Sequence, residues 1–161
     1  MTQSRTTDRP ETAGVLVAPP IAFGGAFALA LVLQFVRPWP IASHTLAARV
    51  AGGVLIAAGL ALSGLVMRHF ARADTPVIPW QETRHLVVSG PYRFSRNPDY
   101  VGQTLIVAGL GLLLRNLWVL PLLVPALLLV RYGVIAREER YLERRFGDDY
   151  RRFRSRVRRW L

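Results

Sequence analysis

The 161-residue sequence lacks cysteine and lysine, and it carries only 10 acidic residues against 21 arginines. The absence of cysteine excludes disulfides, thiolate metal sites and thiol catalysis. A formal net charge of +11 would suit nucleic acid, but the arginines alternate with long apolar runs, a pattern typical of proteins that meet anionic lipid headgroups. We therefore expect membrane lipids, and no nucleic acid, among the partners of the chain.

Apolar residues, by contrast, make up 52% of the chain and gather in long runs. A helix needs about 20 apolar residues to cross the hydrocarbon core of a bilayer. The runs fall at residues 15–36, 46–67, 100–114 and 117–135, and the last two are separated by the short polar turn Arg115-Asn116. They predict an all-α integral membrane bundle of about four transmembrane helices, the last two forming a hairpin.

The order of these segments predicts one membrane-embedded domain over residues 1–161. We expect a disordered tail at 1–14, two membrane helices at 15–70, a long loop at 71–99, the helical hairpin at 100–136 and a helical tail at 137–161. Arginine is concentrated in the loop and in the tail, which predicts a multi-pass protein with both termini and the loop in the cytoplasm. The use of arginine without lysine is typical of a GC-rich genome that favours alanine and arginine. We expect the protein to lie in a bacterial inner membrane.

Small residues recur at helical spacing in the second apolar run. Gly53, Ala57 and Ala61 lie four residues apart, so that on a helix they form one narrow stripe. Stripes of this kind let two membrane helices approach closely. We expect another helix to pack against this stripe.

The C-terminal tail predicts an amphipathic helix after a break at Gly147. Tyr150, Phe153, Val157 and Trp160 lie at spacings of three, four and three residues, opposite a face of arginines. Glycine commonly ends a helix and acidic residues favour the start of the next one. Two compatible interpretations follow: the helix lies on the inner leaflet of the membrane, or it packs on the cytoplasmic loop.

Polar residues beside the apolar runs are the candidates for chemistry. Asn97-Pro98-Asp99 has the composition of a helix start, with an asparagine cap, proline at the first position and an acid in the first turn. His85 lies in the long loop. Arg131 interrupts the fourth run, where a charge either marks a functional site or reaches back to the interface. Glu138 follows seven residues later, on the same helix face.

Four ordered motifs in the C-terminal half carry a resemblance. They are Gly90-Pro91-Tyr92, the segment Arg96-Asn97-Pro98-Asp99-Tyr100-Val101-Gly102, the pair Glu138-Glu139 with Leu142, and Phe146-Gly147 with Tyr150. This order and separation resemble the isoprenylcysteine carboxyl methyltransferase and phospholipid methyltransferase superfamily. The family pattern is Gly-Pro-Tyr, Arg-His-Pro-x-Tyr-x-Gly, a helix pair, Glu-Glu-x-x-Leu and Phe-Gly-x-x-Tyr.

The resemblance implies that the domain is an integral membrane enzyme that uses S-adenosylmethionine. The methyl acceptor would be a carboxylate, amine or thiol of an amphiphilic or lipid-like molecule at the cytoplasmic face. Carried over by position, the cofactor contacts would fall on Arg84, His85, Leu86, Val87, Tyr92, Asn97, Pro98, Asp99, Tyr100 and Glu138. An open N-terminus of the third helix would suit the carboxylate of the donor, and the glutamates its ammonium or ribose hydroxyls.

The sequence departs from the family pattern in two places. Asn97 stands where the family has histidine, which excludes a titrating imidazole but keeps hydrogen bonding. Val134 stands where the prenylcysteine enzymes have a substrate-contacting arginine, and Arg131, one turn earlier, is the candidate to replace it. We expect Arg131 and Glu139 to be catalytic, with either Glu138 or Glu139 accepting the proton of an ammonium acceptor.

Two other functions remain open from the sequence. One is an NADPH-dependent membrane reductase of the sterol-reductase type, which shares a related architecture. The other is a membrane scaffold without catalytic activity, whose arginine tail binds anionic lipid. No pattern in the sequence resembles a metal site, so no metal is expected.

Overall fold

The computed structural model describes residues 13–41, 45–73 and 85–161, and these ranges form helices without any β-strand. The disordered tail expected at 1–14 therefore lies almost wholly outside the described residues. The elements are α1 (Pro19–Val36), α2 (Leu46–Arg72), the short 3-10 helix η1 (Gly90–Arg93), α3 (Pro98–Leu113), α4 (Val119–Val130), the π-helical segment η2 (Arg131–Ile135), α5 (Ala136–Phe146) and α6 (Asp148–Arg156).

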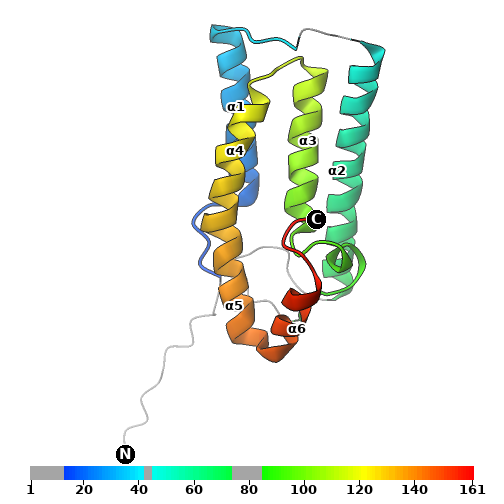
Figure 1. The fold of residues 1–161 in the computed structure, drawn as a ribbon, viewed down its shortest axis with the longest axis vertical. Helices are drawn as coiled ribbons and strands as arrows, with labels where there is room; N and C mark the ends of the chain where they lie inside the picture. The colour runs from blue at the N-terminus through cyan, green and yellow to red at the C-terminus, as the bar shows by residue number, and fades with distance from the viewer. Residues whose placement is uncertain (1–12, 42–44, 74–84) are drawn as a thin grey trace, which may run out of the picture.

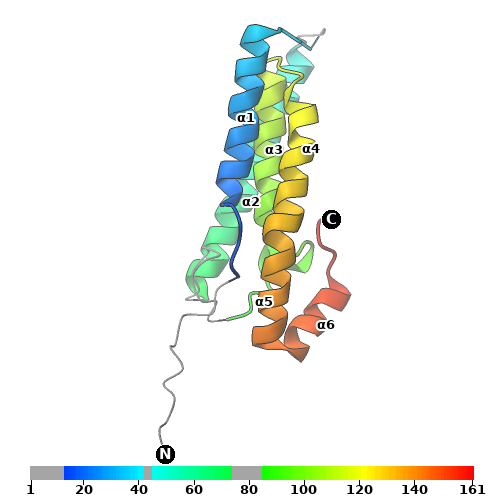
Figure 2. The ribbon, with the colours of Figure 1, turned by 90° about the vertical axis from the view of Figure 1, so that its left-hand side faces the viewer.

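The long helices stand side by side, with α3 between α2 and the pair formed by α1 and α4 (Figure 1). The segments α4, η2 and α5 follow one another without a break and form a single column (Figure 2). At the lower end of this column the chain turns at Gly147 and α6 folds back beneath α3. The all-α bundle predicted from the sequence is confirmed.

Three helical stretches of the described chain are long and apolar enough to cross a membrane: Pro19–Val36, Leu46–Arg72 and Val119–Phe146. The sequence predicted about four. Helix α3 has 16 residues and is about 24 Å long at about 1.5 Å per residue, short of the ~30 Å hydrocarbon core. Large apolar side chains such as Phe35, Leu46 and Ile21 point outward and are 90%, 76% and 66% exposed. Such an apolar exterior suits lipid rather than water.

Glycines bring α2 and α3 into close contact. A Cβ atom added at Gly59 would lie 2.5 Å from the Gly102 carbonyl oxygen, and one at Gly109 would lie 2.6 Å from that of Gly52. The stripe of Gly53, Ala57 and Ala61 is instead exposed, so the prediction that this stripe carries the contact is wrong. The face of α2 that contacts α3 instead contains Gly52 and Gly59, which are seven residues apart, and Gly52 directly precedes Gly53.

The ends of several elements agree with the sequence pattern. Pro98 occupies the first turn of α3 with Asp99 after it, and Gly147, at φ 51°, separates α5 from α6. Helix α6 ends at Arg156, whereas the predicted amphipathic pattern continued to Trp160. The Tyr150 side chain is buried and Trp160 packs against the core. The tail therefore packs on the protein, as the second interpretation expected.

Candidate functional site

A cavity of about 430 Å³ lies at the end of the bundle where α3 begins. It is walled by the first turn of α1, the last turns of α2, the segment before η1, the start of α3, and α5 with α6. Its polar lining residues are His85, Tyr92, Arg96, Asn97, Asp99, Tyr100, Gln103, Glu138, Glu139, Tyr141 and Tyr150. Cavities of roughly 300–1,000 Å³ typically hold small molecules.

Acidic side chains and hydroxyls meet on one wall of the cavity. The Tyr100 hydroxyl donates to the Glu138 carboxylate, at 3.0 Å from one oxygen and 3.1 Å from the other. Asp99 accepts from the Ser63 hydroxyl at 2.8 Å and from the Gln103 amide at 2.7 Å. These contacts hold both carboxylates in place and leave lone pairs for further donors, because an ionised carboxylate accepts about four hydrogen bonds.

Tyr92 projects from η1 and packs its ring against Phe70, with ring centroids 5.8 Å apart. Burial, together with the nearby Glu138 and Asp99 charges, raises the pKa of the Tyr92 phenol. The hydroxyl therefore stays neutral at physiological pH and can donate a hydrogen bond into the cavity.

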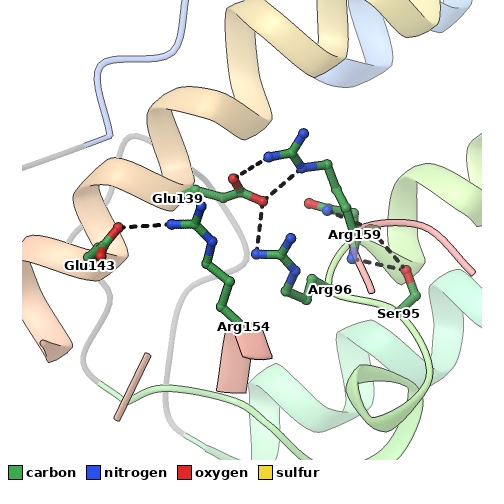
Figure 3. A network of polar contacts seen from close by, with 7 residues as sticks. Ser95, Arg96, Glu139, Glu143, Arg154 and Arg159 are labelled. Atoms are coloured by element: carbon green, nitrogen blue, oxygen red, sulfur yellow. Dashed lines mark hydrogen bonds and ion pairs between the residues drawn. The ribbon is translucent and has the colours of Figure 1, made fainter. Parts of the chain in front are cut away.

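Glu139 is the centre of an ionic cluster (Figure 3). The Arg159 guanidinium donates to both of its oxygens, through Nε at 2.9 Å and Nη2 at 2.7 Å. From the other side, Nη1 of Arg96 lies 3.1 Å from Oε1 of Glu139. A second ion pair, between Arg154 and Glu143 at 3.1 Å, joins α6 to α5 one turn further on. Two cations thus share the single Glu139 charge.

Arg96 is a cavity residue that the sequence analysis did not select. Only 10% of its side chain is exposed, and its buried Nε has no hydrogen-bond acceptor among the residues that the structure describes. Arg96 also interacts with Tyr150. Burial and the Glu139 charge raise the pKa of the Tyr150 phenol to about 12, while Arg96 acts in the opposite direction. The signal in the sequence was the position of Arg96 directly before Asn97 in the second motif, but a motif does not reveal that a guanidinium lacks an acceptor.

Asn97 stands at the cap position of α3, yet its side chain makes no capping hydrogen bond. Its Nδ2 donates 2.9 Å to the backbone carbonyl of Arg159, and its backbone N–H donates 3.1 Å to the Ser95 hydroxyl. Asn97 is thus the cap residue of α3, as predicted, but its side chain is held toward the C-terminal segment by the Nδ2 contact instead of capping the helix. Asn97 and Arg159 are 62 residues apart in the chain, so local sequence could not indicate this contact.

The structure brings most of the predicted site residues to one cavity. Those that line it are His85, Leu86, Val87, Tyr92, Asn97, Asp99, Tyr100, Glu138 and Glu139. Pro98 is buried at the start of α3 and is not part of the lining. Arg131 is exposed on η2, with its guanidinium 5.4 Å from the Tyr132 ring centroid, and does not line the cavity. Arg84 lies outside the described residues.

The cavity also reaches the apolar exterior of the bundle. Pro20 of α1 and Met67 of α2 line it while being exposed on the outer surface. Both belong to helices long enough to cross a membrane. The cavity therefore combines a set of polar side chains with apolar walls and an apolar margin. Within the described ranges, no group of three acidic or histidine side chains could hold a metal ion.

Comparison with known proteins places the chain in a family. The phospholipid methyltransferase family matches residues 47–149, from the start of α2 to the start of α6. An uncharacterized protein of Haemophilus influenzae is 57% identical over 35 residues, which are 22% of this chain and 56% of that protein. The match thus spans little more than half of that relative. No solved structure matches the chain. The matched range contains Arg96, Glu139 and most of the residues that line the cavity. Because it covers more than half of the chain, we conclude that the chain belongs to the phospholipid methyltransferase family.

Proposed function

We propose that the cavity binds S-adenosylmethionine and that the protein transfers its methyl group to an amphiphilic, lipid-like acceptor. The observation that carries this proposal is Arg96, whose Nε has no acceptor among the described residues, in the lining of a cavity that also holds Glu138 and Asp99. A zwitterionic ligand with one carboxylate and one ammonium group complements both signs of charge. Family membership supports methyl transfer as the reaction.

The lining suits the parts of S-adenosylmethionine. The Arg96 guanidinium would take the carboxylate, which satisfies its buried N–H, and Glu138 and Asp99 would take the ammonium or the ribose hydroxyls. Phe70, Tyr92 and Leu86 supply an aromatic and apolar wall for the adenine ring. A water-soluble cofactor would enter from the polar end of the bundle.

The acceptor would reach the cavity from the membrane. Pro20 and Met67 mark the margin where the cavity meets the lipid-facing surface of α1 and α2. An amphiphile could place its polar group inside while its apolar part stays among these helices. The polar end of the bundle, with the arginine-rich α5 and α6, would lie in the cytoplasm.

The bound donor supplies a methyl group activated by a sulfonium. The chain contributes orientation and exclusion of water, which are the main requirements of an in-line displacement. A carboxylate or thiolate acceptor needs no base. For an amine acceptor, we assign proton acceptance to Glu138, which faces the Tyr100 hydroxyl. Glu139 is engaged by two guanidiniums and acts as their counter-ion, and the proposal gives the exposed Arg131 no catalytic contact.

Binding of labelled S-adenosylmethionine to the purified protein tests this proposal. We expect Tyr100→Ala combined with Glu138→Ala to raise Kd at least about tenfold, since a hydrogen bond to a charged group contributes about 1.5–3 kcal/mol. Tyr132→Ala serves as the matched control, because this tyrosine is exposed and lies outside the cavity. Unchanged affinity in the double variant would refute the site.

Thermal unfolding distinguishes the rival functions. Saturating S-adenosylmethionine should stabilise the folded protein by a few kcal/mol, about 2.7 kcal/mol at a concentration 100 times Kd. Stabilisation by NADPH alone would instead indicate a reductase. Stabilisation by neither compound, together with binding to acidic vesicles that Glu138→Ala leaves unchanged, would indicate the lipid-binding scaffold.

A further inference from the structure

We infer that Arg159 is a positioning residue that keeps Arg96 available for an anionic group of the ligand by occupying both oxygens of Glu139. The inference rests on the proposed function, because it concerns the same cavity. Arg159 itself does not line the cavity, whereas Arg96 and Glu139 do. Its effect on the ligand would therefore pass through these two side chains.

The two arginines that contact Glu139 do so unequally. Arg159 makes the two-pronged contact, with Nε 2.9 Å from Oε1 and Nη2 2.7 Å from Oε2. Within the described ranges, Arg96 makes one ion-pair contact, from Nη1 to Oε1 at 3.1 Å, and its Nε has no acceptor. Its guanidinium also interacts with the Tyr150 hydroxyl. A planar guanidinium and a carboxylate pair best through two parallel hydrogen bonds, so only one arginine at a time can take this arrangement.

The consequence concerns charge. Arg96, Arg159 and Glu139 together carry one excess positive charge next to the cavity. If the Arg159 guanidinium were removed, Glu139 would be free to pair with Arg96 through both oxygens and would neutralise it. Arg96 would then have less affinity for a ligand anion, although it would still line the cavity.

The backbone of the tail places Arg159 where this competition is possible. The Arg96 N–H donates to the carbonyl of Arg158 at 2.9 Å, and the Asn97 amide donates to the carbonyl of Arg159 at 2.9 Å. The segment after α6 is therefore fastened directly beside the start of α3. Among the many arginines of the tail, position 159 is the one whose guanidinium reaches the cluster around Glu139 (Figure 3).

The first test compares Arg159→Gln with Arg154→Gln in the purified full-length protein. Both changes break an ion pair between the tail and α5, but the Arg154–Glu143 pair lies outside the cavity. We expect Arg159→Gln to raise the Kd of S-adenosylmethionine at least about tenfold and Arg154→Gln to change it less than about twofold. Equal effects of the two variants would overturn the inference.

The second test separates charge competition from simple tethering. We expect Glu139→Gln, added to Arg159→Gln, to restore most of the lost affinity, because Arg96 then has no carboxylate to neutralise it. A tether would predict no recovery. The ligand 5′-methylthioadenosine, which lacks the carboxylate, should bind Arg159→Gln and the unchanged protein equally well. Absent recovery, or an equal loss with this ligand, would refute the inference.

Two controls keep the result interpretable. Thermal unfolding shows whether each variant is folded, and Arg159→Lys, which keeps the charge but not the two-pronged contact, replaces Arg159→Gln if the latter fails to fold; it should give an intermediate Kd. If the unchanged protein binds no S-adenosylmethionine, the proposed function fails. If it binds and Arg159→Gln binds equally well, only the role of Arg159 fails.

Discussion

Asn97 illustrates how a single side chain can keep a family position while its chemistry changes. The family pattern has histidine at this position. Asparagine keeps one property of a neutral imidazole, because both provide an N–H donor. In the structure that donor is used by the Arg159 carbonyl at 2.9 Å. Asn97 also belongs to the lining of the cavity. This position therefore requires a hydrogen-bond donor that points toward the C-terminal segment.

This requirement predicts different outcomes for two substitutions of similar size. Asn97→His at pH 8, where an ordinary imidazole is neutral, should keep the contact with the Arg159 carbonyl and retain affinity for S-adenosylmethionine. Asn97→Asp replaces the donor by a carboxylate that repels the carbonyl, and should lower the free energy of unfolding by about 1–3 kcal/mol. Thermal unfolding and ligand binding measure both effects. Equal stability of the two variants would contradict the assigned donor role.

Among the helices, α4 and α5 are joined by the π-helical segment Arg131–Ile135. There the Gly133 carbonyl accepts 3.2 Å from the N–H of Leu16, and the Arg137 guanidinium donates 2.8 Å to the Gly14 carbonyl. π-Helical turns of this kind are frequent at functional sites. Here the turn fastens the segment before α1 alongside the column, and this segment supplies Ala13 and Ala18 to the cavity wall.

The close contact of α2 and α3 gives a matched pair of substitutions. Gly59→Ala should reduce the free energy of unfolding by about 1–3 kcal/mol, because the new methyl group meets the Gly102 carbonyl oxygen at 2.5 Å. Gly53→Ala should not lower it and should raise it by up to about 1 kcal/mol through helix propensity, since a Cβ there meets nothing within 4 Å. Unfolding in detergent measures both. The opposite order would restore the stripe of Gly53, Ala57 and Ala61 as the contact face.

The molecule as a unit has an apolar body and one strongly polar end. The cavity, η1 and α6 lie at that end, while the end of α1 and the start of α2 lie at the other (Figure 1). Ten of the 21 arginines follow Ala136. This distribution favours a cytoplasmic position for the polar end, since basic residues flanking membrane helices are retained on that side.

The absence of cysteine makes this orientation directly measurable. Pro38→Cys and Ser155→Cys each introduce one thiol, at exposed positions on opposite ends of the bundle. A membrane-impermeant maleimide should label Pro38→Cys in intact cells and should label Ser155→Cys only after lysis. The reverse pattern would place the polar end outside the cytoplasm and would contradict the proposed entry of the cofactor.

Hydrophobic run lengths, helix boundaries and motif order were readable from the sequence because they depend on local composition. The apolar runs predicted the positions of the long helices, Pro98 and Gly147 predicted two helix boundaries, and the ordered motifs led to the methyltransferase family. Nine of the predicted site residues line one cavity.

Tertiary structure alone decided which faces and which distant segments meet. Gly52 and Gly59 rather than Gly53 form the contact with α3, because a difference of one residue turns a helix face by about 100°. The state of Arg96 depends on Arg159, which occupies both oxygens of Glu139 and lies 20 residues from that glutamate in the sequence. Such pairings arise from the packing of the whole chain, which local composition does not encode.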